Sequence, residues 1–303
     1  MSIRPVTSET AATPTMEGAG VHLHRAFGFQ NPEQMDPFLL FDDFRNDDPR
    51  HYQRGFPWHP HRGIETITYV LAGTVDHADS LGNTGALGAG DVQWMTAGSG
   101  ILHQEMPHGN KAGQMHGFQL WANLPGHLKM TQPRYQDVES KEIPEITDDD
   151  GTVVRVIVGS FWGKTGPVDG IAADPQYLDI SVPAGVKKTF KIDTHKSAFA
   201  YVFEGAGNFR DASRPRGVLL EKKVRGREVN IRDMSGDRTL VQFGRGEEVT
   251  VQAGDHGLRF LLISGAPIRE PVAWHGPIVM NTDAEIRQAI ADLRNGTFIK
   301  PAH

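Results

Sequence analysis

The chain has 303 residues, which is enough for two domains of ordinary size. Its formal net charge of −6 argues against a polyanion as partner, so direct nucleic-acid binding is not expected. The chain has no cysteine, which excludes disulfides, cysteine-based zinc sites and thiol nucleophiles.

The beginning of the chain gives an expectation about location. The first twenty residues lack the apolar core of a signal peptide, and no stretch approaches the roughly 18 apolar residues that a membrane span needs. We therefore expect a cytoplasmic protein without a membrane partner.

Short apolar segments follow one another from Val21 to about Tyr135. They read PFLLFDDF, IETITYVLAG, DVQWMTAGSG and FQLWANL, and each is bounded by Gly, Pro, Asn or Asp. Such segments are typical of strands in a β-sandwich or β-barrel. The 34 glycines and 19 prolines, spread along the whole chain, agree with many turns between short strands.

A second series of similar segments follows an acidic, polar stretch at residues 134–151. It includes TVVRVIVGSFWG, QYLDISVPAG, AFAYVFEGAG and RFLLISGAPI, and the endings YVLAG and YVFEGAG echo one another between the two series. The pattern predicts an all-β protein with a duplicated barrel, divided into residues 1–135 and 136–303. Within the second series, we expect a solvated hairpin at the basic cluster of Lys222, Lys223, Arg225 and Arg227.

One segment near the end of the chain predicts a helix. In NTDAEIRQAIADLRNG, Thr282 can cap the first turn together with Glu285, and Gly296 can end the helix. The helical period follows from the apolar residues Ile286, Ala289, Ile290 and Leu293. We expect this helix to cover the flank of a barrel.

Two histidines stand just before an apolar run in the segment WHPHRGIETITYVLAG. His59 and His61 are two residues apart, so on an extended backbone their side chains point to the same face. Imidazole nitrogens bind first-row transition metals well. The pair alone is weak evidence, because His22 and His24 repeat the same spacing elsewhere.

A second pair with the same spacing strengthens the metal hypothesis. In GSGILHQEMPHG, His103 and Glu105 are also two residues apart. If their strand lies beside that of His59 and His61, at a spacing of about 4.8 Å, all four side chains can converge inside one barrel. Three neutral nitrogens and one carboxylate suit one divalent transition metal, namely Fe²⁺, Mn²⁺, Ni²⁺, Cu²⁺ or Zn²⁺. On an octahedral ion they leave two positions for substrate or dioxygen.

These motifs resemble the pirin family of the cupin superfamily. The resemblance rests on DPFLLFDDF, GFPWHPHRGIETITYVLAG, GDVQWMTAGSGILHQEMP, HGFQLWANLP and HGPIVMNT, and it extends from about Val21 to the terminal helix. It implies a bicupin, with two jelly-roll β-barrels in tandem and one metal, usually iron, in the first barrel. By matching position, the family's metal ligands correspond to His59, His61, His103 and Glu105.

Two functions are consistent with this resemblance. One is quercetin 2,3-dioxygenase activity, in which dioxygen opens the ring of a flavonol-like aromatic substrate. The alternative is a metal-dependent, redox-sensitive regulatory protein that binds an enzyme or a transcription factor. The second half of the chain contains no His-x-His followed by His-x-Glu, so we expect its barrel to hold no metal.

Other residues are assigned around the predicted centre. Glu65 competes with Glu105 for the carboxylate position, and the resemblance favours Glu105, which could also act as general base. His116 and Gln119 could orient the ligands by hydrogen bonds or simply pack in the barrel. Four side chains could wall a site for an aromatic substrate or belong to the core: Phe56, Trp58, Trp94 and Met95. The polar segment 210–236 could be an inserted hairpin.

Overall fold

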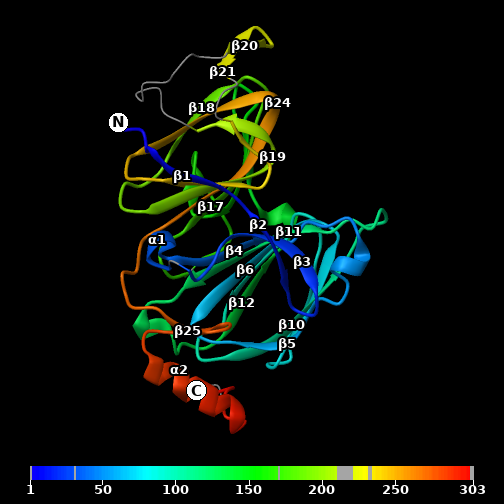
Figure 1. The fold of residues 1–303 in the computed structure, drawn as a ribbon, viewed down its shortest axis with the longest axis vertical. Helices are drawn as coiled ribbons and strands as arrows, with labels where there is room; N and C mark the ends of the chain where they lie inside the picture. Colours follow the sequence, from blue (N-terminus) through cyan, green and yellow to red (C-terminus); the bar gives the residue numbers. More distant parts are fainter. Residues whose placement is uncertain (1, 31, 170, 210–220, 231–233, 301–303) are drawn as a thin grey trace. The chain divides into compact units, whose positions relative to one another are not determined.

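The computed structural model describes residues 2–30, 32–169, 171–209, 221–230 and 234–300. Strands dominate it, and its two α-helices are α1 (Pro32–Met35) and α2 (Asp283–Arg294), as Figure 1 shows. The predicted all-β class is therefore confirmed. Among the described residues, no helix is both long and apolar enough to cross a lipid bilayer.

The chain divides into two compact units. Unit 1 consists of residues 1–12 and 143–267, and unit 2 of residues 13–142 and 268–303. The strands of unit 2 are β2 (Thr13–Glu17), β3 (Val21–Phe27), β4 (Phe38–Asp43), β5 (Phe56–His61), β6 (Ile64–Ala72), β7 (Thr74–Asp79), β8 (Thr84–Leu87), β9 (Val92–Thr96), β10 (Ile101–His108), β11 (His116–Asn123), β12 (Arg134–Val138), β25 (Ala273–His275) and β26 (Ile278–Met280). Those of unit 1 are β1 (Val6–Ala11), β13 (Glu145–Thr147), β14 (Val153–Val158), β15 (Ser160–Phe161), β16 (Lys164–Thr165), β17 (Gln176–Val182), β18 (Lys187–Lys191), β19 (Ser197–Asn208), β20 (Glu221–Val224), β21 (Arg227–Asn230), β22 (Ser235–Gly236), β23 (Thr239–Phe243) and β24 (Glu248–Gly265).

Unit 2 contains two large antiparallel sheets and the small two-stranded sheet of β25 and β26. The larger sheet has seven strands in the order β12-β9-β6-β11-β4-β3-β2, and the smaller has four in the order β5-β10-β7-β8. Burial alternates along β10, so that His103 and Glu105 are buried while their neighbours on the other face are partly exposed. The central strand β6 is buried on both faces over most of its length, as expected in the middle of a sheet.

Unit 1 is built around one curved nine-stranded sheet. The 18-residue strand β24 pairs with β17, β18 and β19, and the register of β19 on β24 shifts at two places. At one of these places Gly205 has a φ of +70°, and a Cβ there would lie 2.2 Å from the carbonyl oxygen of Gly257. The sheet encloses a core of aliphatic and aromatic side chains, among them Val156, Leu178 and Phe260.

The units differ from the linear division predicted at residue 135. Residues 1–12 belong to unit 1 with the second half of the chain, because β1 pairs with β23 as an edge strand of its sheet. Residues 268–303, which include α2, belong to unit 2 instead of the second barrel. Contacts between residues far apart in the chain, namely the pairing of β1 with β23 and the packing of α2 with Leu102, decide both assignments, which is why local sequence patterns do not predict them.

Helix α2 begins and ends where the sequence predicts. Thr282 accepts a hydrogen bond from the Glu285 backbone while Glu285 bonds back to Thr282, which completes the capping box. Gly296 follows the helix with a φ of +69°. The apolar side of α2 packs in a cluster with Leu102 of β10, so the helix covers the outer face of the smaller sheet of unit 2.

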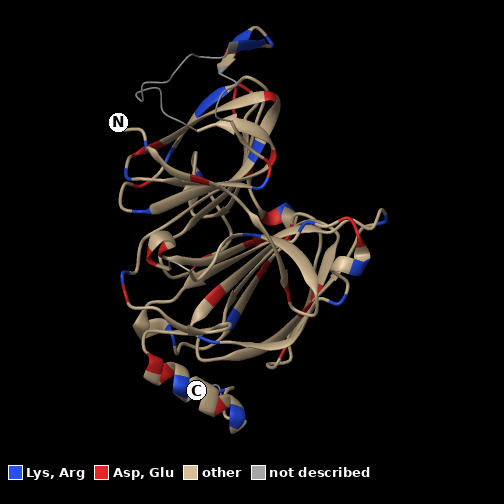
Figure 2. Ribbon diagram, in the orientation of Figure 1, with Lys and Arg blue, Asp and Glu red and all other residues tan. Residues whose placement is uncertain are grey.

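The predicted basic hairpin is formed by β20 and β21. Its four basic side chains are exposed, and Figure 2 shows the concentration of Lys and Arg on this hairpin. Much of the wider segment 210–236, namely residues 210–220 and 231–233, lies outside the described residues.

Candidate metal centre

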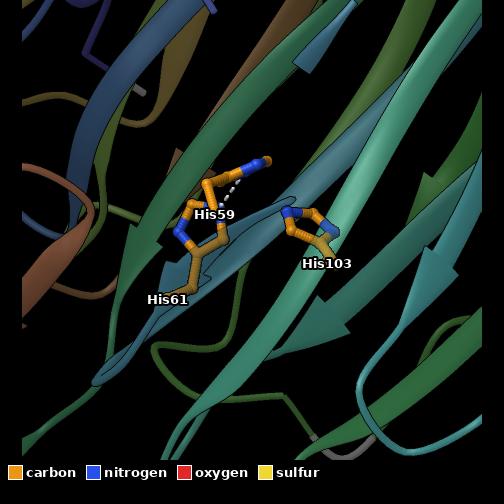
Figure 3. Close-up of side chains that lie close together, drawn as sticks. All are labelled: His59, His61 and His103. Carbon is orange, nitrogen blue, oxygen red and sulfur yellow. Dashed lines mark hydrogen bonds between the residues drawn. The ribbon is translucent and has the colours of Figure 1, made fainter. Parts of the chain in front are cut away.

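Three histidines meet where β5 and β10 pair. The strands are antiparallel, and the register places His103 directly opposite His59, with His61 opposite Ile101. Because His59 and His61 share one face of β5, both rings reach the ring of His103, as Figure 3 shows. The ligand nitrogens of the three residues all lie within 4.8 Å of one another.

The distances inside this group fit a shared ion. His59 Nε2 and His61 Nε2 are 3.0 Å apart, and the ring centroids of His59 and His103 are 4.4 Å apart. Two nitrogens at about 2.1 Å from one ion, at a right angle, lie about 3.0 Å from each other. The Nδ1–H of His59 donates to the Pro57 carbonyl at 2.9 Å, which leaves its Nε2 lone pair free to bind a metal.

The electrostatics keep these rings in the form that binds metals. Burial lowers the pKa of His61 and that of His103 well below the ordinary value, and neighbouring imidazoles lower both further. Burial also lowers the pKa of His59. Neither ring nitrogen of His103 has a hydrogen-bond partner among the described residues, although the ring is buried. Unpaired buried nitrogens are costly, and a metal ion would satisfy them.

Glu105 lies beside this group but is not part of it. Its Oε2 is 3.9 Å from His103 Nε2, and a shift in register between His103 and Glu105 places it opposite Phe56. The Thr68 hydroxyl lies 3.1 Å from Glu105 Oε1. Burial raises the pKa of Glu105 to about 7, and the Thr68 hydrogen bond counteracts this in part. Glu105 is thus positioned to approach an ion or a substrate from one side.

The competing carboxylate, Glu65, lies elsewhere. It is buried and accepts a hydrogen bond of 2.7 Å from Thr96, its partner across β6 and β9. Thr68, which contacts Glu105, is three residues further along β6 and therefore points to the other face. The second His-x-His pair is also separate, because His22 lies on β3 with its ring stacked on His51 at 4.2 Å.

A cavity of about 490 Å³ opens onto His59 and His61, two of the three clustered histidines. This volume is within the usual range for small-molecule sites. Its charged and polar lining comes from Glu17, Arg25, Asp42, His59, His61, Glu105 and Gln119, and its apolar lining from Leu23, Phe29, Leu40, Phe44, Phe56, Trp121 and Trp274, completed by Gly18, Pro57, Gly276 and Pro277.

The predicted neighbours of the centre divide between cavity and core. Phe56 and Gln119 line the cavity, and Gln119 Oε1 is 2.9 Å from the Thr68 hydroxyl. Trp94 and Met95 are buried and do not line the cavity, so for them the packing alternative holds. His116 packs edge-on against Phe118 on the other face of β11 from Gln119. Trp58 is 52% exposed and is not part of the cavity lining.

Local sequence reasoning missed several lining residues. Arg25 and Asp42 come from β3 and β4, and Trp274 comes from a strand more than 200 residues away from His61. The only local signal was the alternation in the first half of β3, which gives the faces of a strand but not which face borders a cavity.

The end of β5 is held by a tight turn. Gly63 has a φ of +76°, and a Cβ there would lie 1.9 Å from the carbonyl oxygen of Val279. The ammonium of buried Lys129 donates to the carbonyls of Gly63 and Val279 and to the side chain of Asn123. These contacts fix the backbone two residues after His61.

Replacing Gly63 with Ala should therefore destabilise the protein more than the same change at Gly82. Gly82 also has a positive φ, of +91°, but its added Cβ would meet nothing within 4 Å. We expect a loss of about 1–2 kcal/mol for Gly82→Ala from backbone strain, and a further loss of about 1–3 kcal/mol for Gly63→Ala from the clash. Urea denaturation measures both, and equal losses would contradict the packing described.

Comparison with known proteins agrees with this arrangement. Residues 20–122 match the family described as Pirin, and residues 177–299 match the pirin C-terminal cupin domain. A pirin-like protein of Caulobacter vibrioides is 42% identical over 98% of this chain and 100% of its own length. Human pirin is 39% identical over 97% of this chain and 93% of its own.

A solved structure supports the fold of the whole chain. The crystal structure of a quercetin 2,3-dioxygenase from Acinetobacter baumannii superposes with a TM-score of 0.83 at 32% identity, and the match covers 98% of each chain. With two cupin domains and this level of identity along nearly its full length, the chain belongs to the pirin family.

Proposed function

We propose that the protein is a metal-dependent dioxygenase that opens the ring of a flavonol-like aromatic substrate. The observation that carries the proposal is a cluster of three imidazoles, two of them buried and one partly buried, beside a cavity lined by aromatic side chains. The likeness to a solved protein named quercetin 2,3-dioxygenase supports the choice of substrate class.

His59, His61 and His103 would hold the metal, and Glu105 would complete the set as a fourth donor. Three imidazoles and one carboxylate suit Fe²⁺, which we favour, and also Zn²⁺, Mn²⁺, Ni²⁺ and Cu²⁺. When bound, such a metal supplies Lewis acidity and a meeting point for dioxygen and an enolic oxygen of the substrate.

The side chains around the centre bind and orient the substrate. Phe29, Trp121 and Trp274 offer ring faces on which a planar aromatic molecule can stack while water is excluded. The ring of Trp121 stands perpendicular to that of His61 at 5.2 Å, so a molecule stacked there lies next to the metal-binding histidines. Glu105 would take the proton of the substrate hydroxyl, with Thr68 holding its carboxylate in place.

The test uses the protein loaded with Fe²⁺ under nitrogen and then supplied with quercetin and air. We expect oxygen uptake matched by carbon monoxide release. His103→Ala should reduce the rate by more than about 100-fold, because losing a ligand costs at least as much as losing a group that orients one. His108→Ala is the matched control, since His108 lies on the same strand with an exposed side chain paired to Asp76. Absence of turnover by the metal-loaded protein would overturn the proposal and favour the regulatory role.

A further inference from the structure

Four polar side chains form a continuous row across the larger sheet of unit 2. Arg25 pairs with Asp42 across β3 and β4, Asp42 pairs with Gln119 across β11, and Gln119 pairs with Thr68 across β6. Directly paired residues on neighbouring strands point to the same face of a sheet. The row therefore runs along the cavity and ends at Thr68, whose hydroxyl contacts Glu105.

An ion pair stands at the far end of this row. Arg25 donates two parallel hydrogen bonds to Asp42, of 2.8 and 2.7 Å, and a third nitrogen lies 2.8 Å from Glu17. Asp42 is only 5% exposed, and burial raises its pKa to about 6 against the opposing effect of Arg25. A buried ion pair of this kind contributes little to the free energy of folding, because apolar side chains of the same size in its place would often stabilise the protein as much or more. A carboxylate can accept more hydrogen bonds than the two that Arg25 donates.

The other cavity walls are suited to a flat ring. Phe29 and Trp274 stack at 5.0 Å with an interplanar angle of 19°, and Trp121 meets Phe29 edge-on at 6.0 Å. A ligand that fills this cavity thus meets aromatic faces together with one line of hydrogen-bonding groups. Polar groups of this kind, few and fixed, determine the orientation and specificity of bound ligands.

From this arrangement we infer that the Arg25–Asp42 pair is a specificity site for hydroxyl groups on the end of the aromatic substrate remote from the metal. The inference rests on the proposed function and adds the substrate feature that is recognised. Asp42 is two strand spacings, or about 10 Å, from Thr68, which suits a fused aromatic molecule that spans the row. Asp42 would accept the hydroxyl proton in a hydrogen bond, and Arg25 would hold the carboxylate in place.

Two probes separate this inference from simple packing. Quercetin carries hydroxyls on both outer rings, whereas 3-hydroxyflavone keeps only the hydroxyl next to the carbonyl. Binding of each to the metal-loaded protein under nitrogen is measured by calorimetry, so the result does not depend on turnover. Asp42→Asn should reduce the preference for quercetin over 3-hydroxyflavone by about 10–100-fold, the range for a hydrogen bond to a charged group.

A second variant and a control keep the test decisive. Arg25→Gln should lower the same preference while leaving 3-hydroxyflavone binding within a few-fold of wild type, and Asp76→Asn, a change at an exposed acid outside the cavity, should leave it unchanged. Unchanged preference in both cavity variants, with folding verified by circular dichroism, would overturn the inference. That outcome can occur with full dioxygenase activity, and a loss of preference can occur without any turnover, so the two proposals fail separately.

Discussion

Replacing Glu105 with Gln is expected to lower kcat for quercetin oxidation by about 10²–10⁴-fold, the usual effect of removing a general base. Glutamine keeps the shape of the side chain and can still accept the Thr68 hydrogen bond, but it cannot take a proton from the substrate. It is also a poorer donor to a divalent metal than a carboxylate. Initial rates of oxygen uptake with Fe²⁺-loaded protein measure the effect.

Glu65→Gln is the matched control for this prediction. Glu65 is also a buried acid with a threonine partner, but it lies away from the histidine group, and its variant should keep wild-type kcat. The metal content of Glu105→Gln separates the two roles of that residue. A variant that retains metal but loses kcat identifies a base, and one that loses the metal identifies a ligand. Retention of both the metal and the rate would refute any role for Glu105.

Replacing Asp292 with Leu is expected to lower the free energy of unfolding by about 3–5 kcal/mol, the cost of leaving a buried charge without its partner. Arg62 is 2% exposed and donates to Asp292 at 2.8 Å, to the Ser99 carbonyl at 2.7 Å and to the Phe298 carbonyl at 2.9 Å. Its guanidinium also lies 4.1 Å from the centre of the Phe298 ring. Urea denaturation followed by tryptophan fluorescence measures the loss.

A double variant tests whether the ion pair is the cause. Replacing Arg62 with Met together with Asp292→Leu removes both charges, and this should restore part of the lost stability. If packing alone were responsible, the double variant would lose at least as much free energy of unfolding as the two single variants lose together. Because Arg62 follows His61 in the chain, metal affinity should decrease in the single variant and recover in the double one.

The pH dependence of the same pair has a defined sign. Burial would raise the pKa of Asp292, but hydrogen bonds from Lys300, Arg62 and Gln288 outweigh this and hold the pKa well below its ordinary value. An acid whose pKa is lowered by folding stabilises the protein at pH values above its pKa in the unfolded chain, about 3.9 for Asp. That contribution disappears as the pH falls through its pKa in the folded protein. The difference between wild type and Asp292→Leu should therefore be constant from about pH 5 to 8 and shrink below about pH 4.

The convergence of the three histidines could be predicted because their spacing matches the period of a strand. His59 and His61 must share a face of β5, and an adjacent antiparallel strand brings His103 opposite His59. The position of Glu105 was less predictable. The shift in register after His103 depends on how the two strands bend. The residue types from His103 to Glu105 do not indicate such a shift.

A fully buried strand illustrates a second limit of local reasoning. All residues of β9 are buried, so the hydrophobic pattern cannot tell that Gln93 and Trp94 point to opposite faces with different surroundings. Likewise, the place of β1 beside β23 depends on a pairing between residues more than 200 positions apart, which local propensities do not encode. The terminal helix was predictable because its capping box and apolar period are both local.

Elemental analysis of the purified protein tests the central claim most directly. After incubation with Fe²⁺ under nitrogen and desalting, the wild type should retain about one metal ion per chain, and the variant with His59, His61 and His103 all replaced by Ala should retain none. A control with Ala at His22, His24 and His108 should bind as the wild type does. Retention of the metal by the first variant, or its absence from the wild type, would contradict the account.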